Sequence, residues 1–191
     1  MYALPTLTAT EITTDRLRLR KAHGADIDGL IELQTDPQVR AHLGGPRPRN
    51  VVEQYFEANG INAIAGKPGT YVIADRKTDR FIGTLVLDRR APDLPGHVTK
   101  EGGELELAYL LRRGSWGAGL AFEAATAVLC AAAGELPDQP VLVVTQTANK
   151  RSLKLATHLG FQRIGTFEAH DAEQTLAVAD LHSFKARSPI S

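Results

Sequence analysis

The stretch LLRRGSWGAGL, residues 110–120, places two arginines and three glycines directly before an alanine-rich segment. A glycine-rich turn exposes backbone N–H groups, and the N-terminus of a following helix adds partial positive charge, so such a turn suits a phosphate or diphosphate. Glycine also serves simply to turn the chain before a helix. Taken alone, the loop fits either role.

Spacing narrows the kinds of anion site that the loop resembles. A Walker loop requires Gly-Lys-Ser/Thr before its helix, whereas this chain has Gly119, Leu120 and Ala121 there. A dinucleotide fingerprint starting at Gly117 would require a small residue where Phe122 stands, in an all-parallel unit that the upstream hairpin pattern does not resemble. Neither nucleotide-binding motif is present.

The elements before the loop follow from periodicity and turn residues. Alternation of apolar and basic residues predicts a strand, apolar residues at helical spacing predict helices, and a polar turn between two apolar runs predicts an antiparallel hairpin. The expected elements are a strand at 16–21, a helix from 26 to the turn at Asp36-Pro37, a short helix through Leu43, a helix at 51–64 broken near Gly60, a hairpin at 70–75 and 81–88, and a strand at 104–111.

After the loop, the pattern changes to alternating helices and strands. Residues 141–147 form a β-branched run typical of a strand buried on both faces in a parallel sheet. Gly160 is a helix-ending glycine. The expected elements are a helix from Leu120, a strand at 141–147, a helix at 149–158, and strands at 161–169 and 175–184. The order predicts an α/β fold, a mixed α+β sheet covered by helices.

Composition limits the function classes. The 191 residues predict a single domain spanning 1–191, and the balance of 22 basic and 22 acidic residues favours neither a nucleic-acid partner nor a membrane surface. The sequence shows no leader-like start and no span long enough for a bilayer, so we expect a soluble cytoplasmic protein. The six histidines include no ligand-spaced pair, so no metal site is expected.

Two longer motifs point to a family. ELAYLLRRGSWGAGLAFEA and NKRSLKLATHLGFQRIG, with TDRLRLR near the start, together resemble the acetyl-CoA motifs of the GCN5-related N-acetyltransferase (GNAT) superfamily. The similarity is to the branch of ribosomal-protein N-terminal acetyltransferases of the RimJ/RimL type and covers roughly residues 13–184. It implies a mostly antiparallel central sheet with a splayed parallel strand pair and helices on both faces.

The resemblance also implies acetyl-CoA as the cofactor and assigns its contacts. The loop amides would take the diphosphate, main-chain groups near Leu110 and Leu111 would pair with the pantetheine arm, and Asn149 would bond that arm. Gly114 stands where the superfamily usually has Gln or Arg, and Arg112 or Arg113 could compensate. The implied cofactor-binding residues are Leu110, Leu111, Arg112, Arg113, Ser115, Trp116, Gly117, Ala118, Gly119, Leu120, Asn149 and Ser152. Trp116 itself is expected to pack as a hydrophobic anchor.

Acetyl transfer to an amine requires a proton acceptor and a proton donor for the departing thiolate. By similarity, Glu106 is the candidate base, acting directly or through water. Glu104, two residues earlier on the same strand face, is a second acidic wall that could bind a cationic substrate. Ser152 is the first candidate donor and Tyr109 the second. Glu123 lies in the first turn of the predicted helix, where a negative charge interacts favourably with the helix dipole.

The acceptor is not specified by these motifs. Expected acceptors are the N-terminal amine of a protein such as a ribosomal protein, or a small-molecule amine, and a non-catalytic acyl-CoA-binding module is the competing class. Selectivity would lie around residues 36–66, 89–103 and 168–176. A homodimer is a further possible partner.

Overall fold

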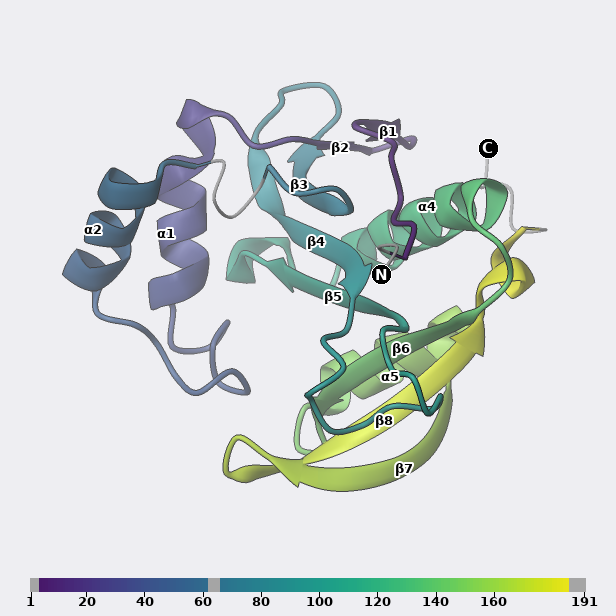
Figure 1. Cartoon of the computed structure of the whole chain (residues 1–191). Helices are drawn as coiled ribbons and strands as arrows, with labels where there is room; N and C mark the ends of the chain where they lie inside the picture. The colour runs from purple at the N-terminus through teal and green to yellow at the C-terminus, as the bar shows by residue number, and fades with distance from the viewer. Residues whose placement is uncertain (1–3, 62–65, 186–191) are drawn as a thin grey trace.

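A computed structural model describes residues 4–61 and 66–185. One eight-stranded sheet crosses the described chain in the order β1-β2-β3-β4-β5-β6-β8-β7 (Figure 1). The strands are β1 (Ile12–Thr13), β2 (Leu17–Arg20), β3 (Thr70–Asp75), β4 (Phe81–Arg89), β5 (Leu105–Leu111), β6 (Pro140–Gln146), β7 (Gln162–Ala169) and β8 (Ala172–Asp180). All neighbouring strands are antiparallel except β5 and β6, which are parallel.

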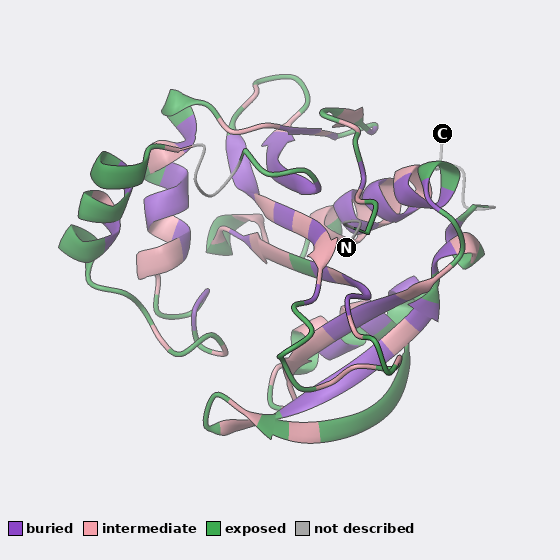
Figure 2. Ribbon diagram, viewed as in Figure 1, coloured by how far each residue is buried: buried purple, intermediate pink, exposed green. Residues whose placement is uncertain are grey.

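Helices cover both faces of the sheet. They are α1 (Ile27–Thr35), α2 (Arg49–Asn59), α4 (Leu120–Glu135) and α5 (Lys150–Leu159). In β3, Val72 and Ala74 share a core with α1 and α2, whereas Tyr71 and Ile73 belong to the core that contains α4. Because strand side chains alternate between faces, β3 is buried throughout its centre (Figure 2). The predicted helix-covered mixed sheet is confirmed.

The sheet opens between its two parallel strands. β5 pairs with β6 only at Leu105–Val141 and Glu106–Leu142, although each strand has seven residues. Each strand is fully paired on its other side, β5 with β4 and β6 with β8. Beyond Glu106 the two strands therefore diverge, and their facing main-chain groups do not complete a ladder.

Two predicted elements differ from the structure, and one predicted break is confirmed. The predicted helix through Leu43 is wrong: residues 37–44 form turns, and the Arg40 guanidinium stabilises them by donating to the Leu43 and Gly45 carbonyls. Helix α2 ends at Asn59, ahead of Gly60 at φ 70°, which confirms the predicted break near Gly60; residues 62–65 lie outside the described part. The last strand ends at Asp180, and a 3-10 helix follows at Leu181–Phe184.

No helix among the described residues is long and apolar enough to cross a membrane. β7 forms one edge of the sheet. This strand is largely exposed, in contrast to β3 and β4 (Figure 2). Its hairpin with β8 turns through His170 and Asp171, both with positive φ, as a two-residue hairpin turn requires.

Candidate functional site

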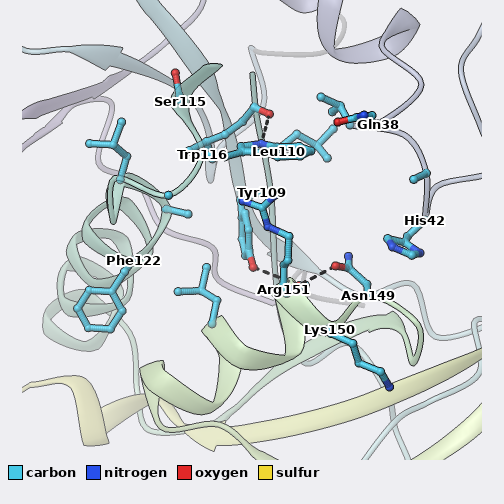
Figure 3. A pocket seen from close by; sticks show the side chains of 18 of the residues that line it. Gln38, His42, Tyr109, Leu110, Ser115, Trp116, Phe122, Asn149, Lys150 and Arg151 are labelled. Atoms are coloured by element: carbon cyan, nitrogen blue, oxygen red, sulfur yellow. Dashed lines mark hydrogen bonds between the residues drawn. The ribbon is translucent and has the colours of Figure 1, made fainter. Parts of the chain in front are cut away.

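A cavity of about 580 Å³ lies where β5 and β6 separate (Figure 3). Its walls come from the end of β5, the loop that follows, the first turns of α4 and α5, and the segment after α1. The lining residues are Gln38, Val39, Ala41, His42, Tyr109, Leu110, Leu111, Ser115, Trp116, Gly117, Gly119, Leu120, Ala121, Phe122, Ala148, Asn149, Lys150, Arg151, Ser152 and Leu155. The sheet opening and the glycine loop thus form one site.

The glycine loop presents unpaired backbone donors beside this cavity. Gly117 and Gly119 have φ of 82° and 75°, which explains glycine at both positions. The amides of Ser115 and Trp116 are used within the turn, donating to Arg112 and Arg113 carbonyls. The amides of residues 117–120 donate to no described residue, so this part of the predicted cradle is available to an anion.

An ion pair holds the loop in place. Glu123 in α4 accepts hydrogen bonds from Thr14 Oγ1 at 2.5 Å, from the Arg16 amide at 3.0 Å and from Arg16 Nε at 2.6 Å. Arg16 in turn donates to the Ala118 carbonyl at 2.9 Å. Burial alone would raise the pKa of Glu123, but these donors lower it below its ordinary value. Glu123 therefore anchors the loop, a role that the dipole interpretation missed because its partners are over one hundred residues away.

The two arginines of the loop itself do not line the cavity. Arg112 pairs with Glu32 of α1 at 2.5 Å and faces a separate cavity, and Arg113 is exposed. The cations that line the site are Lys150 and Arg151, which the sequence prediction did not select. The signal was available in NKRS, where both residues stand at the start of the helix that closes the site.

Arg151 and Lys150 differ in their contacts. The Lys150 ammonium donates to the Thr147 carbonyl at 2.8 Å and points away from the cavity (Figure 3). The Arg151 guanidinium carbon lies 4.1 Å from the ring centre of Trp116. Trp116 is fixed in turn, because its Nε1 donates to the Leu111 carbonyl at 2.9 Å. Trp116 thus serves as the expected anchor and also as a platform for Arg151.

Tyr109, Ser152 and Asn149 meet at the base of the cavity. The Tyr109 hydroxyl lies 3.1 Å from Ser152 Oγ. Burial raises the pKa of Tyr109, and the bond to Ser152 offsets part of that rise. Asn149 caps α5 by accepting from the Ser152 amide at 3.2 Å and donates to Thr145 Oγ1 at 3.1 Å. The two candidate proton donors are therefore in contact, and Asn149 orients one of them.

Glu106 lies on the other face of β5 from Tyr109, since the two are three residues apart on a strand. It does not line the cavity, and its Oε2 accepts from Arg90 Nη1 at 2.7 Å. Arg90, whose side chain is 7% exposed, also donates to the Pro95 carbonyl. The candidate base is thus held by a buried cation and lies outside the cavity lining, at the last paired position before β5 and β6 diverge.

The expectation of an acidic wall at Glu104 is wrong. Glu104 is 4% exposed and accepts hydrogen bonds from the Val98 and Thr99 amides, at 2.8 and 2.7 Å, and from His97 Nδ1 at 2.6 Å. Burial alone would raise its pKa, but His97 and the amides lower it to about 2. Glu104 therefore fixes the loop between β4 and β5 and cannot meet a substrate.

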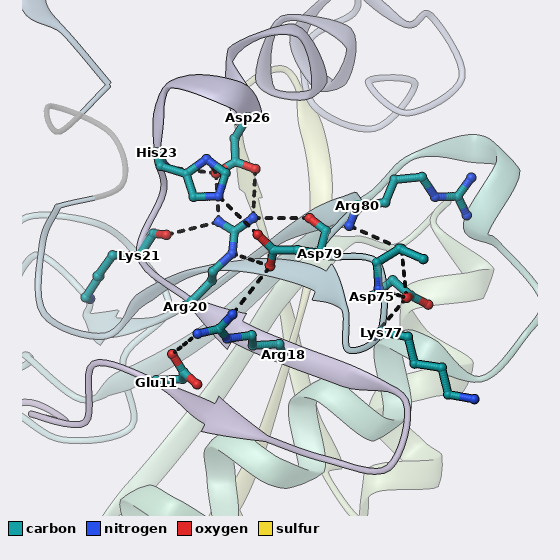
Figure 4. Close-up of polar contacts among 11 residues, drawn as sticks. Glu11, Arg18, Arg20, Lys21, His23, Asp26, Asp75, Lys77, Asp79 and Arg80 are labelled. Atoms are coloured by element: carbon teal, nitrogen blue, oxygen red, sulfur yellow. Dashed lines mark hydrogen bonds and ion pairs between the residues drawn. The ribbon is translucent and has the colours of Figure 1, made fainter.

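Two further histidines line the two cavities. His42 lines the cavity, with Nδ1 3.3 Å from Gln146 Oε1, while His23 lies beside Asp26 and Asp79 in the second cavity (Figure 4). Within the described ranges, no three His, Cys, Asp or Glu side chains are grouped to hold a metal ion.

The structure is that of an α/β protein whose mixed sheet opens between two parallel strands. A glycine loop and a helix N-terminus lie at this gap, an arrangement that suits an anionic ligand. Residues 16–162 match the family model described as Acetyltransferase (GNAT) domain. The chain belongs to this family of acetyltransferases.

Related proteins agree with this assignment. The chain is 27% identical over 160 residues to the uncharacterized N-acetyltransferase p20 of Bacillus licheniformis, which covers 83% of this chain and 85% of that protein. A spermidine N-acetyltransferase from Vibrio cholerae, solved with CoA and spermine, superposes with a TM-score of 0.64 at 12% identity, covering 88% of this chain and 97% of that one. The ribosomal L7/L12 alpha-N-protein acetyltransferase RimL superposes with a TM-score of 0.63 at 15% identity, covering 88% and 93%. These two similarities establish the fold.

Proposed function

We propose that this acetyltransferase uses acetyl-CoA and transfers the acetyl group directly to an amine, with the N-terminal amine of a protein or peptide as its acceptor class. The observation that carries the proposal is the cleft between β5 and β6, where the amides of residues 117–120 have no described acceptor and face a cavity of about 580 Å³. We assign the acetyltransferase core to residues 13–184.

The cleft residues fit an acyl-CoA. The amides of residues 117–120 would bind its diphosphate, as anions bind at helix N-termini. Main-chain groups of Leu110 and Leu111, on the stretch of β5 that has left β6, would pair with the pantetheine arm. Acetyl-CoA supplies an activated thioester, so transfer forms a C–N bond, breaks a C–S bond and leaves a thiol.

The protein's own groups would move two protons. Glu106, acting through water from the margin of the site, would accept a proton from the amine, and its pair with Arg90 holds the carboxylate in position. Ser152, in contact with Tyr109, would donate the proton that the departing thiolate takes up. The amine nitrogen and the thioester sulfur are bonded to the same carbon during transfer, so both protons would move at the gap between β5 and β6, with water linking Glu106 to the amine.

The charges beside Glu106, where the amine would enter, favour a peptide amine over a polyamine. The two carboxylates on this face at the start of β5 are already engaged, Glu106 with Arg90 and Glu104 with His97 and two backbone amides. A polyamine carries several ammonium groups, which would lose water without meeting carboxylates. An α-amine followed by neutral main chain would not incur this cost, which supports the RimJ/RimL-like assignment over the alternative of a polyamine-type small-molecule acceptor.

A thiol-release assay with acetyl-CoA tests the proposal, using a panel of peptide N-termini, monoamines and spermidine. We expect turnover with peptides and a loss of about 100-fold in kcat/KM for Glu106→Gln, since general base catalysis contributes roughly that much or more. Glu11→Gln, an exposed carboxylate paired with Arg18, should match the wild type. Binding of acetyl-CoA without turnover of any amine would identify a non-catalytic acyl-CoA-binding module, and turnover of spermidine alone would refute the acceptor class.

A further inference from the structure

Arg151 spans the cleft from one wall to the other. It stands in the first turn of α5, and its side chain rises through the cavity to lie over Trp116 of the glycine loop (Figure 3). The guanidinium carbon is 4.1 Å from the centre of the indole ring. Because Trp116 Nε1 is held by the Leu111 carbonyl, the arginine rests on a fixed surface.

The polar edge of this guanidinium has no partner. Among the described residues, Arg151 makes neither a hydrogen bond nor an ion pair, and its stacking on Trp116 uses only its flat face. Five N–H donors therefore remain in the guanidinium plane, in the fork that matches phosphate oxygens. Stacking limits the rotamers of a long side chain, which reduces the entropy lost when a ligand binds.

The other cations around the loop are already engaged or lie outside the cavity. Arg16 pairs with Glu123, and Arg112 pairs with Glu32 in a separate cavity. Lys150 donates to the Thr147 carbonyl, and Arg113 is exposed and does not line the site. Of the described cavity-lining cations, Arg151 is thus the one whose charged group is available beside the unpaired loop amides.

From this geometry we infer that Arg151 binds a phosphate group of acetyl-CoA, with Trp116 holding its guanidinium in place. The inference rests on the proposed use of acetyl-CoA and adds to it the source of the charge. In this chain the cation comes from helix α5, on the far wall of the cleft, while the loop contributes backbone amides. A phosphate bound at Arg151 would therefore contact both walls of the cleft.

Calorimetric titration with coenzyme A tests the assignment. Arg151→Gln should weaken binding about tenfold or more, as expected for losing charge-assisted hydrogen bonds. Arg151→Lys should lie between Gln and the wild type, because it keeps the charge without the planar fork. Lys154→Gln is the matched control: Lys154 is an exposed cation on the same helix, outside the cavity lining, and its loss should leave the affinity unchanged.

Shortened ligands identify which phosphate is bound. If Arg151 contacts the 3′-phosphate, Arg151→Gln should no longer weaken binding when the ligand is 3′-dephospho-CoA. If Arg151 contacts the diphosphate, the variant should still bind 3′-dephospho-CoA more weakly than the wild type does, and the difference should disappear with pantetheine. Trp116 is the one tryptophan in the sequence, so its fluorescence should change when coenzyme A reaches the stacked pair.

Two results would overturn the inference. One is equal coenzyme A affinity for Arg151→Gln and the wild type. The other is an equal loss with pantetheine, which carries no phosphate and would indicate that Arg151 only packs against Trp116. Failure of the wild type itself to bind coenzyme A would instead refute the proposed use of acetyl-CoA, so the two failures are distinguishable.

Discussion

Two polar regions of the molecule differ in whether their charged groups have hydrogen-bond partners. Around Arg20, donors and acceptors are matched: its Nε lies 2.8 Å from Asp79 Oδ1, and its two terminal nitrogens lie 2.8 and 3.1 Å from the Asp26 carboxylate (Figure 4). In the cleft, Arg151 and the amides of residues 117–120 have no such partners. The first arrangement stabilises the frame, and the second leaves donors for a ligand.

The matched region joins three separate segments. Arg20 ends β2, Asp26 precedes α1, and Asp79 lies in the turn between β3 and β4 with φ 56°. Burial alone would lower the pKa of Arg20, but the two carboxylates raise it, and Arg20 in turn is the main cause of a lowered pKa at Asp79. This network therefore fixes α1 on the sheet and, through α1, the segment that carries Gln38 and His42 to the cleft.

Removing Arg20 should produce the largest loss of stability. Arg20→Met would leave Asp26, which is 2% exposed, as a buried carboxylate without its guanidinium. We expect the free energy of unfolding to fall by about 3–5 kcal/mol, measured by urea denaturation. Arg18→Gln removes an exposed ion pair and should leave the free energy of unfolding nearly unchanged. Equal losses in the two variants would show that the buried Arg20 network stabilises the fold no more than an exposed ion pair does.

Replacement of Glu104 should have the next largest effect. Glu104→Gln would lose charge-assisted bonds from His97, Val98 and Thr99, and we expect a loss of about 2–3 kcal/mol at neutral pH. Because the folded pKa of Glu104 is lowered to about 2, its stabilising contribution is complete above the ordinary carboxyl pKa and is lost as the pH falls towards 2.

Acid denaturation measures this contribution separately. The stability difference between the wild type and Glu104→Gln should shrink as the pH is lowered from about 5 towards 2, because protonation removes the charge that the variant already lacks. His97→Gln serves as a second probe, since it removes one donor and keeps the carboxylate. A stability difference that stays constant across this range would show that Glu104 acts through packing alone.

The sequence predicted the features that depend on neighbouring residues. Period-2 and helical patterns predicted the hairpin, α1 and α5 because the burial that produces them repeats along the chain. The loop at 110–120 was predicted for the same reason, since its glycines, its helix and the turn geometry at Gly117 and Gly119 are local.

Features that depend on distant partners were not predicted. Glu104 appeared exposed because the loop that buries it forms a turn with no periodic pattern, and Arg112 appeared available because Glu32 is eighty residues earlier. The segment through Leu43 appeared helical because its pattern does not reveal that Arg40 would bond its own turn. Charged side chains select among several partners, and only the folded chain determines which one is near.

A pair of glycines in the loop gives the smallest expected effect. Gly119 has φ 75°, where an alanine costs roughly 1–2 kcal/mol, whereas Gly114 lies outside the left-handed region and a Cβ there meets nothing within 4 Å. Gly119→Ala should therefore lower the free energy of unfolding by about 1 kcal/mol, and Gly114→Ala should leave it within about 0.5 kcal/mol. Gly119→Ala should also weaken coenzyme A binding, because relaxing φ at Gly119 reorients the adjoining amides, while Gly114→Ala should not. Urea denaturation and calorimetry of both variants measure the two effects, and equal coenzyme A affinities would show that the anion is held by side chains such as Arg151 and not by the loop amides.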